Sequence, residues 1–256
     1  MIPSAGNPLF DLQQTIYNSR NYTRRRLHRT RLDWVANSIR KYVLKFAAVK
    51  GIEYGPGSGI YLPVLSEFCE MVTAADIESA YLDGIRPLLC TLPNLHLMTD
   101  DIQASTFDND NFDLILCSEV LEHVPKPEQA LNTLYRILKP GGIAIVTTPQ
   151  RFSLMELTCK LAFLPGVIDV VRFIYREPIL ETGHISLRSG TAFGASLKNC
   201  GFQTLEHECF GLYLPLVAEF GGEMGGRLLE TLEKYMRKGR LSGLLWTQAY
   251  VLRKPV

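Results

Sequence analysis

A glycine-rich turn directly after a short apolar strand is the feature that most constrains how this chain can fold. Residues 49–54 have the apolar character of a strand inside a sheet, and residues 55–59 read G-P-G-S-G. Glycine tolerates positive φ angles and lets backbone amides approach a ligand, so this turn suits a strand that feeds a helix beneath a bound group. The dinucleotide fingerprint G-x-G-x-x-G would need glycine where Ile60 stands, which disfavours a nicotinamide-dependent reductase. From this motif alone, a tight turn without a ligand stays an alternative.

The rest of the chain alternates short apolar strands with helical stretches. Further strands are predicted at 71–75, 95–99, 112–117, 143–148, 202–209 and 244–252. Helices are predicted at 60–70, 79–90, 127–138 and 188–200. The strand at 112–117 is almost continuously apolar, as expected where helices cover both faces of a parallel sheet. This alternation predicts an α/β fold.

Charge is unevenly distributed, although the chain of 256 residues carries a formal net charge of only +1. Residues 20–50 hold ten Lys or Arg against one acid, whereas residues 51–130 hold fourteen acids against two bases. The basic arm fits a solvated helix packed near an acidic face, and it equally fits a phosphate-bearing substrate, an anionic membrane or RNA. A hydrophobic content of 46% excludes collagen-like, low-complexity and broadly disordered chains.

Cysteine usage and targeting patterns bear on the compartment. The six cysteines form no C-x-x-C pair and several lie in apolar runs, so we expect small core residues in a reducing compartment. The first residues show no signal-peptide pattern, and no apolar run reaches the length of about eighteen residues that a membrane span needs. A cytoplasmic protein is expected, with peripheral contact to a membrane left open.

Three further features follow the glycine turn at positions suited to a nucleoside ligand. Asp76 ends the second predicted strand, where a carboxylate can bind both hydroxyls of a ribose. Asp101 and Ile102 follow the third strand, where an acid and an adjacent amide can contact an adenine edge. Residues 111–124 read N-F-D-L-I-L-C-S-E-V-L-E-H-V, and L-K-P-G-G follows at 138–142. Together these motifs resemble the class I S-adenosylmethionine-dependent methyltransferases, in particular the small-molecule branch that includes ubiquinone-biosynthesis O-methyltransferases.

The resemblance implies a fold and a cofactor, S-adenosylmethionine. The fold would be a seven-stranded Rossmann-like methyltransferase sheet, mostly parallel with the last strand antiparallel, flanked by helices. The glycine turn would lie under the methionine part of the cofactor, Glu53 would orient its amino group, and Asp76 would bind the ribose. Arg31 would face the cofactor carboxylate, and the backbone of Ser118 the methionine end. The implied cofactor residues are Arg31, Glu53, Tyr54, Gly55, Gly57, Gly59, Asp76, Ile77, Asp101, Ile102 and Ser118.

Methyl transfer to oxygen needs the acceptor's proton to be removed, and the sequence offers two routes. His184 could act as a general base, or a divalent metal could bind the acceptor oxygen and lower its pKa. Glu119, Glu122 and His123 share one face of a helix turn. Their E-x-x-E-H pattern resembles metal-dependent O-methyltransferases, in which a later His, here His184, completes a site suited to Mn, Fe or Zn. Otherwise Glu122 and His123 cap the turn and bind no metal. The candidate catalytic residues are His184, Glu119 and His123.

One methyltransferase domain over residues 1–256 is expected, with helical additions to the sheet. A basic helical arm is predicted at 13–50, a cofactor-binding core at 50–150, a lid at 151–187 and a second insertion at 211–243. The lid reads as two amphipathic helices broken at Pro165 and Gly166. In the second insertion one helix face carries four larger apolar side chains, Leu228, Leu232, Tyr235 and Met236. These surfaces could form an apolar acceptor pocket, lie on a membrane, or bury their apolar faces against each other.

The first functional expectation is methyl transfer to an oxygen of a small apolar or lipid-like acceptor, of quinone, polyketide or glycolipid type. Methylation of RNA ribose or termini is the second, although nucleic acid is not the expected partner. A non-catalytic scaffold that keeps the cofactor fold is the third. The fourth strand lacks the Asn/Asp-Pro-Pro-Tyr that follows it in enzymes acting on exocyclic amines of nucleic-acid bases, which disfavours base N-methylation.

Overall fold

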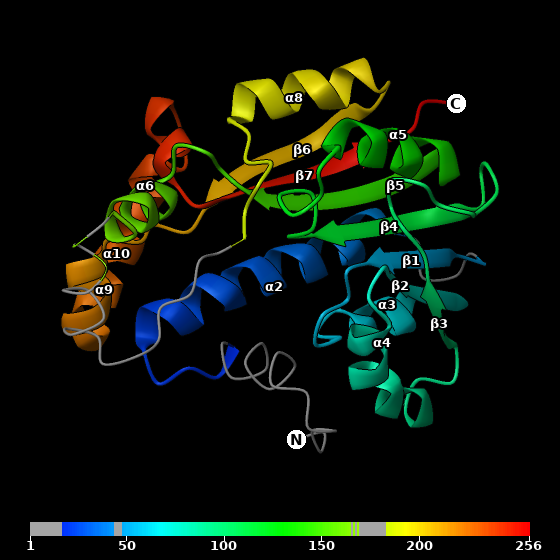
Figure 1. Ribbon diagram of the computed structural model, residues 1–256, viewed down its shortest axis with the longest axis horizontal. Coiled ribbons are helices and arrows are strands. Elements are labelled where there is room, and N and C mark those ends of the chain that lie inside the picture. The colour runs from blue at the N-terminus through cyan, green and yellow to red at the C-terminus, as the bar shows by residue number, and fades with distance from the viewer. Residues whose placement is uncertain (1–16, 44–47, 165, 167, 169–182) are drawn as a thin grey trace.

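Among the described residues, seven strands form one mixed sheet (Figure 1). The computed structural model describes residues 17–43, 48–164, 166, 168 and 183–256. The strands are β1 (Lys50–Tyr54), β2 (Met71–Asp76), β3 (Leu95–Thr99), β4 (Phe112–Ser118), β5 (Leu138–Pro149), β6 (Gln203–Phe210) and β7 (Thr247–Arg253). Their order is β3-β2-β1-β4-β5-β7-β6, and β7 runs antiparallel to both β5 and β6. The predicted sheet, mostly parallel with an antiparallel last strand, is confirmed.

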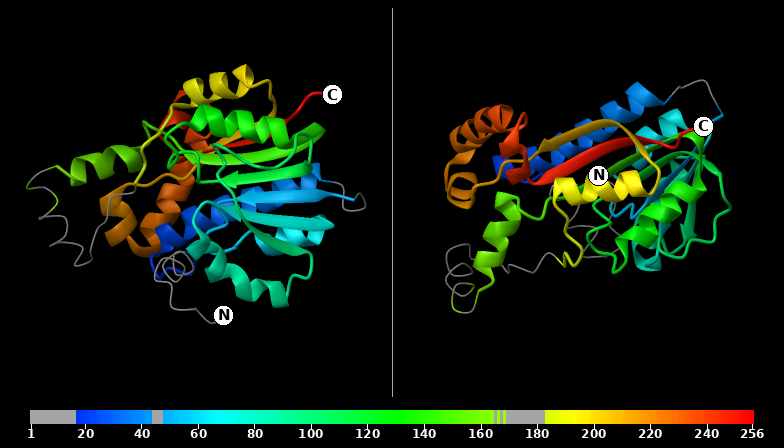
Figure 2. Two further views of the ribbon diagram at one scale, coloured as in Figure 1. Left: turned by 45° about the vertical axis from the view of Figure 1, so that its right-hand side comes forward. Right: turned by 90° about the horizontal axis from the view of Figure 1, so that it is seen from above.

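Helices cover both faces of this sheet. They are α2 (Tyr22–Tyr42), α3 (Leu62–Phe68), α4 (Ser79–Ile85), α5 (Pro127–Ile137) and α8 (Gly190–Asn199), with a 3₁₀ turn η1 (Arg86–Cys90) after α4. Leu114 and Leu116 of β4 pack beneath α2, α3 and α4, whereas Ile115 and Cys117 pack beneath α5 and α8. In the view from above in Figure 2, the blue α2 and the yellow α8 lie on opposite sides of the sheet. Both faces of β4 are therefore buried, which explains its unbroken apolar sequence.

Several predicted boundaries differ from the structure. The strand predicted at 244–252 begins only at Thr247, and the helix predicted at 79–90 ends at Ile85, where a 3₁₀ turn follows. The strand predicted at 143–148 already begins at Leu138, because Phe112 pairs with Leu138 and Gly141 N donates to Lys254 O. The basic arm predicted at 13–50 contains α2, which ends at Tyr42, before β1 starts at Lys50. Residues 13–16 and 44–47 of that arm lie outside the described residues.

The two predicted insertions meet at one end of the sheet (Figure 1). They contribute α6 (Leu154–Ala162), α9 (Pro215–Phe220), α10 (Gly222–Met236) and the 3₁₀ turn η2 (Arg240–Leu244). Leu27 of α2, Ala218 of α9 and Leu229 of α10 share a third buried cluster with Leu245. Residues 165, 167 and 169–182 of the predicted lid lie outside the described residues. No helix in the described part of the chain is long and apolar enough to cross a membrane.

The face of α10 that carries Leu228, Leu232 and Tyr235 is oriented toward solvent. These side chains are 53%, 42% and 78% exposed, whereas Met236 packs against the third buried cluster, as do Leu154 and Met155 of α6. The two insertions therefore bury some of their apolar side chains together, while the rest of this face of α10 is exposed. The buried side of α10 carries Gly226, Leu229 and Glu233 instead. Its packing against α2 is close, because a Cβ at Gly226 would clash with the ring of Tyr22.

Parallel pairing brings the functional ends of four strands together. Tyr54 at the end of β1 pairs with Ala75 of β2 on one side and Cys117 of β4 on the other. Ser118 of β4 pairs in turn with Thr147 of β5. In open α/β sheets a ligand binds at this carboxyl edge, beside the point where strand order reverses. Here the order reverses between β1 and β4.

Candidate active site

A cleft of about 370 Å³ opens at the carboxyl edge of the sheet. It brings together seven of the predicted cofactor residues, namely Tyr54, Gly55, Gly57, Asp76, Ile77, Asp101 and Ile102. Two predicted catalytic residues, Glu119 and His123, line the same cleft. The lining also includes Tyr81 and Gln103, which the sequence analysis did not single out. Arg31, Glu53, Gly59 and Ser118 are not among its lining residues.

The glycine turn adopts the conformation that its sequence predicts. Gly55, Gly57 and Gly59 have φ angles of 66°, 51° and 71°, in the left-handed region that favours glycine. A Cβ at Gly55 would clash with Val120, and one at Gly59 would lie 2.7 Å from Leu88 Cδ1. The turn therefore needs glycine for its φ angles and for close packing.

The buried carboxyl group of Glu53 indicates whether the site fits a positively charged ligand. Its carboxyl group is buried inside β1, and its Oε2 has no hydrogen-bond partner among the described residues. Burial raises the pKa of Glu53 well above its usual value. An isolated buried carboxyl group is costly, and a cationic amino group such as that of S-adenosylmethionine would satisfy it.

The two aspartates that end β2 and follow β3 are held by nearby backbone. Asp76 Oδ1 accepts from Glu78 N at 2.9 Å, and burial raises the pKa of Asp76. Asp101 Oδ1 accepts from Gln103 N at 2.8 Å. Ile77, 59% exposed, also lines the cleft, where its side chain can pack on a planar ring. This arrangement fits a ribose at Asp76 and an adenine beside Ile77 and Asp101.

Tyr54 lines the cleft, but its hydroxyl points to a structural network. It hydrogen-bonds Asp100 Oδ2 at 2.8 Å and Ser105 Oγ at 2.9 Å. Asp100 also accepts from the backbone and hydroxyl of Thr106. This network fixes the loop that carries Asp101, so Tyr54 shapes the site through its ring and through that loop.

Arg31 reaches the site from α2, but its charge is matched by Glu119. The two side chains form an ion pair of 2.7 Å, and both are largely buried. Arg31 also lies over the ring of Trp246 and contacts His28, whose pKa burial lowers first and the Arg31 charge lowers further. Glu119 accepts a second hydrogen bond from Thr147 Oγ1, 3.0 Å away. These contacts turn Glu119 toward Arg31.

The other three predicted metal ligands do come together. Atoms of Glu122, His123 and His184 that could ligate a metal all lie within 4.8 Å of one another, and Glu119 is not part of this group. The four-ligand set predicted from E-x-x-E-H is therefore corrected to three in the structure, because Glu119 is engaged by Arg31. We call Glu122, His123 and His184 the acidic–imidazole group.

Local contacts hold this group in place. Glu122 is buried, and its Oε2 accepts from Thr148 Oγ1 at 3.0 Å while its Oε1 has no partner in the described chain. Burial, then the neighbouring Glu119, raise the pKa of Glu122. Its backbone oxygen accepts from the amides of Ile185 and Ser186, which ties the segment after residue 182 to this turn. His123 belongs both to the group and to the cofactor cleft, so the group borders the cleft.

Glu156 of α6 is a neighbour of His184 that was not among the predicted site residues. Its Oε1 lies 3.0 Å from His184 Nδ1. The signal available in the sequence was S-x-x-E at 153–156, a helix-start pattern that does not reveal a partner so distant along the chain.

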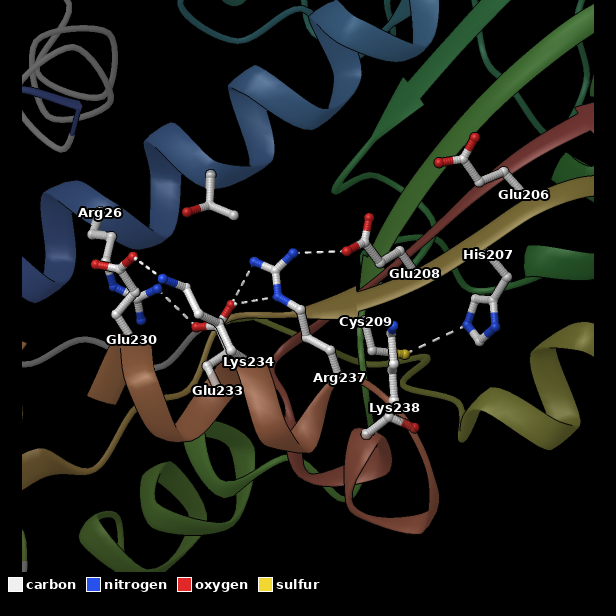
Figure 3. Close-up of a pocket in the computed structure, with 12 residues that line it drawn as sticks. Arg26, Glu206, His207, Glu208, Cys209, Glu230, Glu233, Lys234, Arg237 and Lys238 are labelled. Carbon is white, nitrogen blue, oxygen red and sulfur yellow. Dashed lines mark hydrogen bonds and ion pairs between the residues drawn. The ribbon is translucent and has the colours of Figure 1, made fainter. Parts of the chain in front are cut away.

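A second pocket of about 640 Å³ lies between α2, α10 and β6 (Figure 3). Its charges are matched within the protein: Arg237 pairs with Glu208 and Glu233, each at 2.7 Å, and Arg26 pairs with Glu233. The pocket also contains Cys209, whose pKa burial raises to about 11, so its thiol stays protonated. None of the predicted cofactor residues lines this pocket.

Comparison with known proteins identifies the family. A family model described as "Methyltransferase domain" matches residues 23–207. A ubiquinone biosynthesis O-methyltransferase of Coxiella burnetii (strain Dugway 5J108-111) is 30% identical over 157 residues, which cover 57% of this chain and 67% of that protein. A protein of the same name from Psychrobacter cryohalolentis is 26% identical over 167 residues, covering 56% of this chain and 64% of that protein.

Solved structures agree in fold. A putative sarcosine dimethylglycine methyltransferase from Galdieria sulphuraria superposes with a TM-score of 0.62 at 13% identity, covering 97% of this chain and 99% of that one. The [4+2]-cyclase SpnF superposes with a TM-score of 0.59 at 17% identity, covering 88% of this chain and 81% of that one. With the family model matching most of its length, the chain belongs to the class I S-adenosylmethionine-dependent methyltransferases.

Proposed function

We propose that this enzyme methylates an oxygen of a small apolar acceptor, of quinone, polyketide or glycolipid type. The observation that carries the proposal is the acidic–imidazole group at the border of the cofactor cleft. Two imidazoles and a buried carboxyl group in one place suit the removal of a proton from a hydroxyl group. The names of the curated relatives, which are O-methyltransferases, also support oxygen as the methylated atom.

Residues of the cleft fit the cofactor part by part. Glu53 would satisfy its amino group, Asp76 its ribose hydroxyls, and Asp101 with Ile102 its adenine edge. The bound cofactor supplies the methyl group on a sulfonium, so the protein's task is alignment and proton removal. Arg31 does not line the cleft, so it would bind the cofactor carboxylate only after exchanging Glu119 for that carboxylate.

Proton removal has two candidate routes through the same residues. In the first, His184 accepts the proton of the acceptor hydroxyl. In the second, Glu122, His123 and His184 hold a divalent ion such as Mn, Fe or Zn, which would make the acceptor oxygen more acidic. The partnerless Oε1 of Glu122 and the closeness of the three side chains fit such an ion. Glu119 could become a fourth ligand of this ion only after its ion pair with Arg31 breaks.

Exposed apolar side chains at the end of the molecule that holds α6 and α10 support an apolar acceptor. Leu157 and Leu161 of α6 and Leu164 just beyond it are exposed near the segment that carries Glu156, and Met224 and Leu228 of α10 are exposed on the same end of the molecule. Such surfaces favour a lipid-like acceptor and peripheral contact with a membrane.

An RNA acceptor is less favoured, because four of the ten basic residues in 20–50 form ion pairs within the protein. Arg24 pairs with Glu219, Arg26 with Glu233 and Lys41 with Glu206. Arg31 pairs with Glu119. Three of these four acids belong to the later part of the chain, so the helix packs against acids from outside the acidic central region.

The experiment uses labelled S-adenosylmethionine and a catechol that carries a short isoprenoid tail, with mass spectrometry of the product. A methyl ether is expected, and His184→Gln should lower kcat at least about a hundredfold while leaving S-adenosylhomocysteine affinity unchanged. Loss of activity in chelator with recovery on added Mn would select the metal route; full activity in chelator would select the base route. Methylation of carbon or nitrogen, or full activity of His184→Gln, would contradict the proposal.

A further inference from the structure

We infer that Glu156 is the positioning residue of His184, and that its buried carboxylate keeps the imidazole hydrogen on Nδ1 and the lone pair on Nε2. The inference rests on the proposed function, because it assigns a role at the same acceptor site. It applies to both routes, since a general base and a metal ligand each need a lone pair on the nitrogen that faces the site.

The geometry of the pair supports this assignment. Glu156 Oε1 lies 3.0 Å from His184 Nδ1, and the side chains are only 3% and 9% exposed. A carboxylate oxygen can only accept, so the hydrogen between these atoms belongs to Nδ1. The remaining nitrogen of a neutral His184, Nε2, is then the one available to a proton or a metal.

The start of α6 directs Glu156 toward this role. Ser153 Oγ caps the helix by accepting from Glu156 N at 3.2 Å. In a full capping box the glutamate side chain would return to the amide of Ser153. That amide instead donates to Gln150 O at 3.1 Å, so the Glu156 carboxylate does not close the box. It extends to His184, which comes from a different part of the chain.

His123 shows the same arrangement on the other side of the group. Its Nδ1 lies 3.2 Å from Gly183 O, and a carbonyl oxygen can only accept, so this hydrogen is also on Nδ1. The rings of His123 and His184 are 5.1 Å apart at 61°, edge to face. Both imidazoles therefore have Nδ1 engaged and Nε2 left over. An outer acceptor that fixes each imidazole in this way is typical of metal-binding and catalytic histidines.

The test is a long-range ¹H–¹⁵N spectrum of protein labelled at histidine, with His184→Gln to assign the His184 signals. The wild type should show His184 protonated at Nδ1. In Glu156→Ala the hydrogen should move to Nε2, the form that a free imidazole prefers, or exchange between both nitrogens. Glu156→Gln should keep the Nδ1 hydrogen, because its amide oxygen still accepts. Lys160→Ala, exposed on the same helix, is the control for disturbance of α6.

The kcat of each Glu156 variant should fall in parallel with its loss of the Nδ1 hydrogen on His184. Glu156→Ala should lower kcat by about tenfold to a hundredfold with an unchanged KM for S-adenosylmethionine, and Glu156→Gln should recover part of the loss. A wild-type His184 protonated at Nε2, or an unchanged tautomer in Glu156→Ala, would overturn the inference. If Glu156→Ala does not fold, the wild-type and Glu156→Gln spectra decide. Because the spectra need no turnover, a protein that methylates no oxygen acceptor but shows the expected tautomers would contradict the proposed function alone.

Discussion

At the scale of single residues, the glycine turn makes the clearest prediction. Gly55→Ala should weaken S-adenosylhomocysteine binding at least about tenfold and cost about 1 to 3 kcal/mol of folding free energy. Its φ of 66° is unfavourable for alanine, and the new Cβ would clash with Val120. Calorimetric titration and urea unfolding measure the two effects.

Gly194→Ala is the matched control, because it is interior to α8 and a Cβ there meets nothing within 4 Å. That variant should gain about 0.5 to 1 kcal/mol of stability and bind the cofactor normally. Equal effects of the two substitutions would show that the strained conformation at Gly55 does not matter.

The residues of the cofactor cleft were predictable because each follows a strand directly. Gly55, Asp76 and Asp101 are placed by local chain direction, which a strand–turn pattern reveals. The ion pair between Arg31 and Glu119 was not predictable, because the two residues are remote in the sequence and only the packing of α2 brings them together. Glu156 was missed for the same reason: its partner His184 lies beyond α6 in a separate segment.

At the scale of elements, Glu233 connects α10 to α2 and to the turn after β6. It accepts from Arg26 at 2.8 Å, from Arg237 at 2.7 Å and from Leu212 N at 3.1 Å. Burial alone would raise the pKa of Glu233, but the Arg26 charge and these hydrogen bonds outweigh it and lower the pKa. The ionised carboxylate is thus favoured in the folded state.

Glu233→Gln should therefore lose about 3 kcal/mol of folding free energy at pH 7. A lowered folded-state pKa stabilises the fold above the unfolded value near 4.5, and this contribution is lost as pH falls through the lower folded value. The difference in folding free energy between wild type and Glu233→Gln should stay constant from pH 7 to about 5 and become smaller below pH 5. Urea unfolding at each pH measures this difference. Glu230→Gln, whose partner Lys234 is exposed, is the control and should change stability by less than about 1 kcal/mol. A gap between wild type and Glu233→Gln that widens in acid would contradict the assignment.

The exposed face of α10 tests the expected membrane contact. Met224 and Leu228 are 84% and 53% exposed, and the basic residues Arg227 and Lys234 of this helix pair with Glu223 and Glu230. Cosedimentation with lipid vesicles is therefore expected through insertion of the apolar side chains. Met224→Ser with Leu228→Ser should weaken it at least about tenfold, since each side chain contributes about 1 kcal/mol on insertion. Met98→Ser, at an exposed apolar site on β3, should have no effect. Binding that is absent, or unchanged in the double variant, would contradict contact through this face.

Elements of the sheet were easier to predict than the added helices. The inner strands β1, β2, β4 and β7 are short runs buried on both faces, so their apolar sequences report their environment. On α10 the apolar pattern instead faces solvent, because Gly226 packs against Tyr22 and Glu233 is drawn inward by two arginines. Periodicity shows that a helix is amphipathic but does not show which side meets the core.

At the scale of the whole molecule, the bound cofactor should stabilise the fold because it contacts several elements at once. Its expected ligands come from β1, β2, the loop after β3 and, through Arg31, from α2. A ligand that binds only the folded chain stabilises it by about 2.7 kcal/mol at a hundredfold excess over Kd. For a chain of this size that corresponds to a rise in Tm of roughly 5 to 10 °C. S-adenosylhomocysteine should therefore raise the thermal unfolding midpoint by this amount.

Asp76→Ala should abolish most of that rise, because the ribose would lose its carboxylate partner while the core stays intact. Asp83→Ala, at an exposed ion pair on α4, should keep the full shift. Arg31→Lys should keep part of it, since a lysine retains the charge but cannot reproduce the planar guanidinium contacts with Glu119 or a carboxylate. If S-adenosylhomocysteine raises the Tm of Arg31→Lys as much as that of the wild type, α2 contributes packing rather than a cofactor contact. The cleft then binds S-adenosylhomocysteine without help from Arg31. If the ligand also raises the Tm of Asp76→Ala by the wild-type amount, the nucleoside does not bind at the carboxyl end of β2.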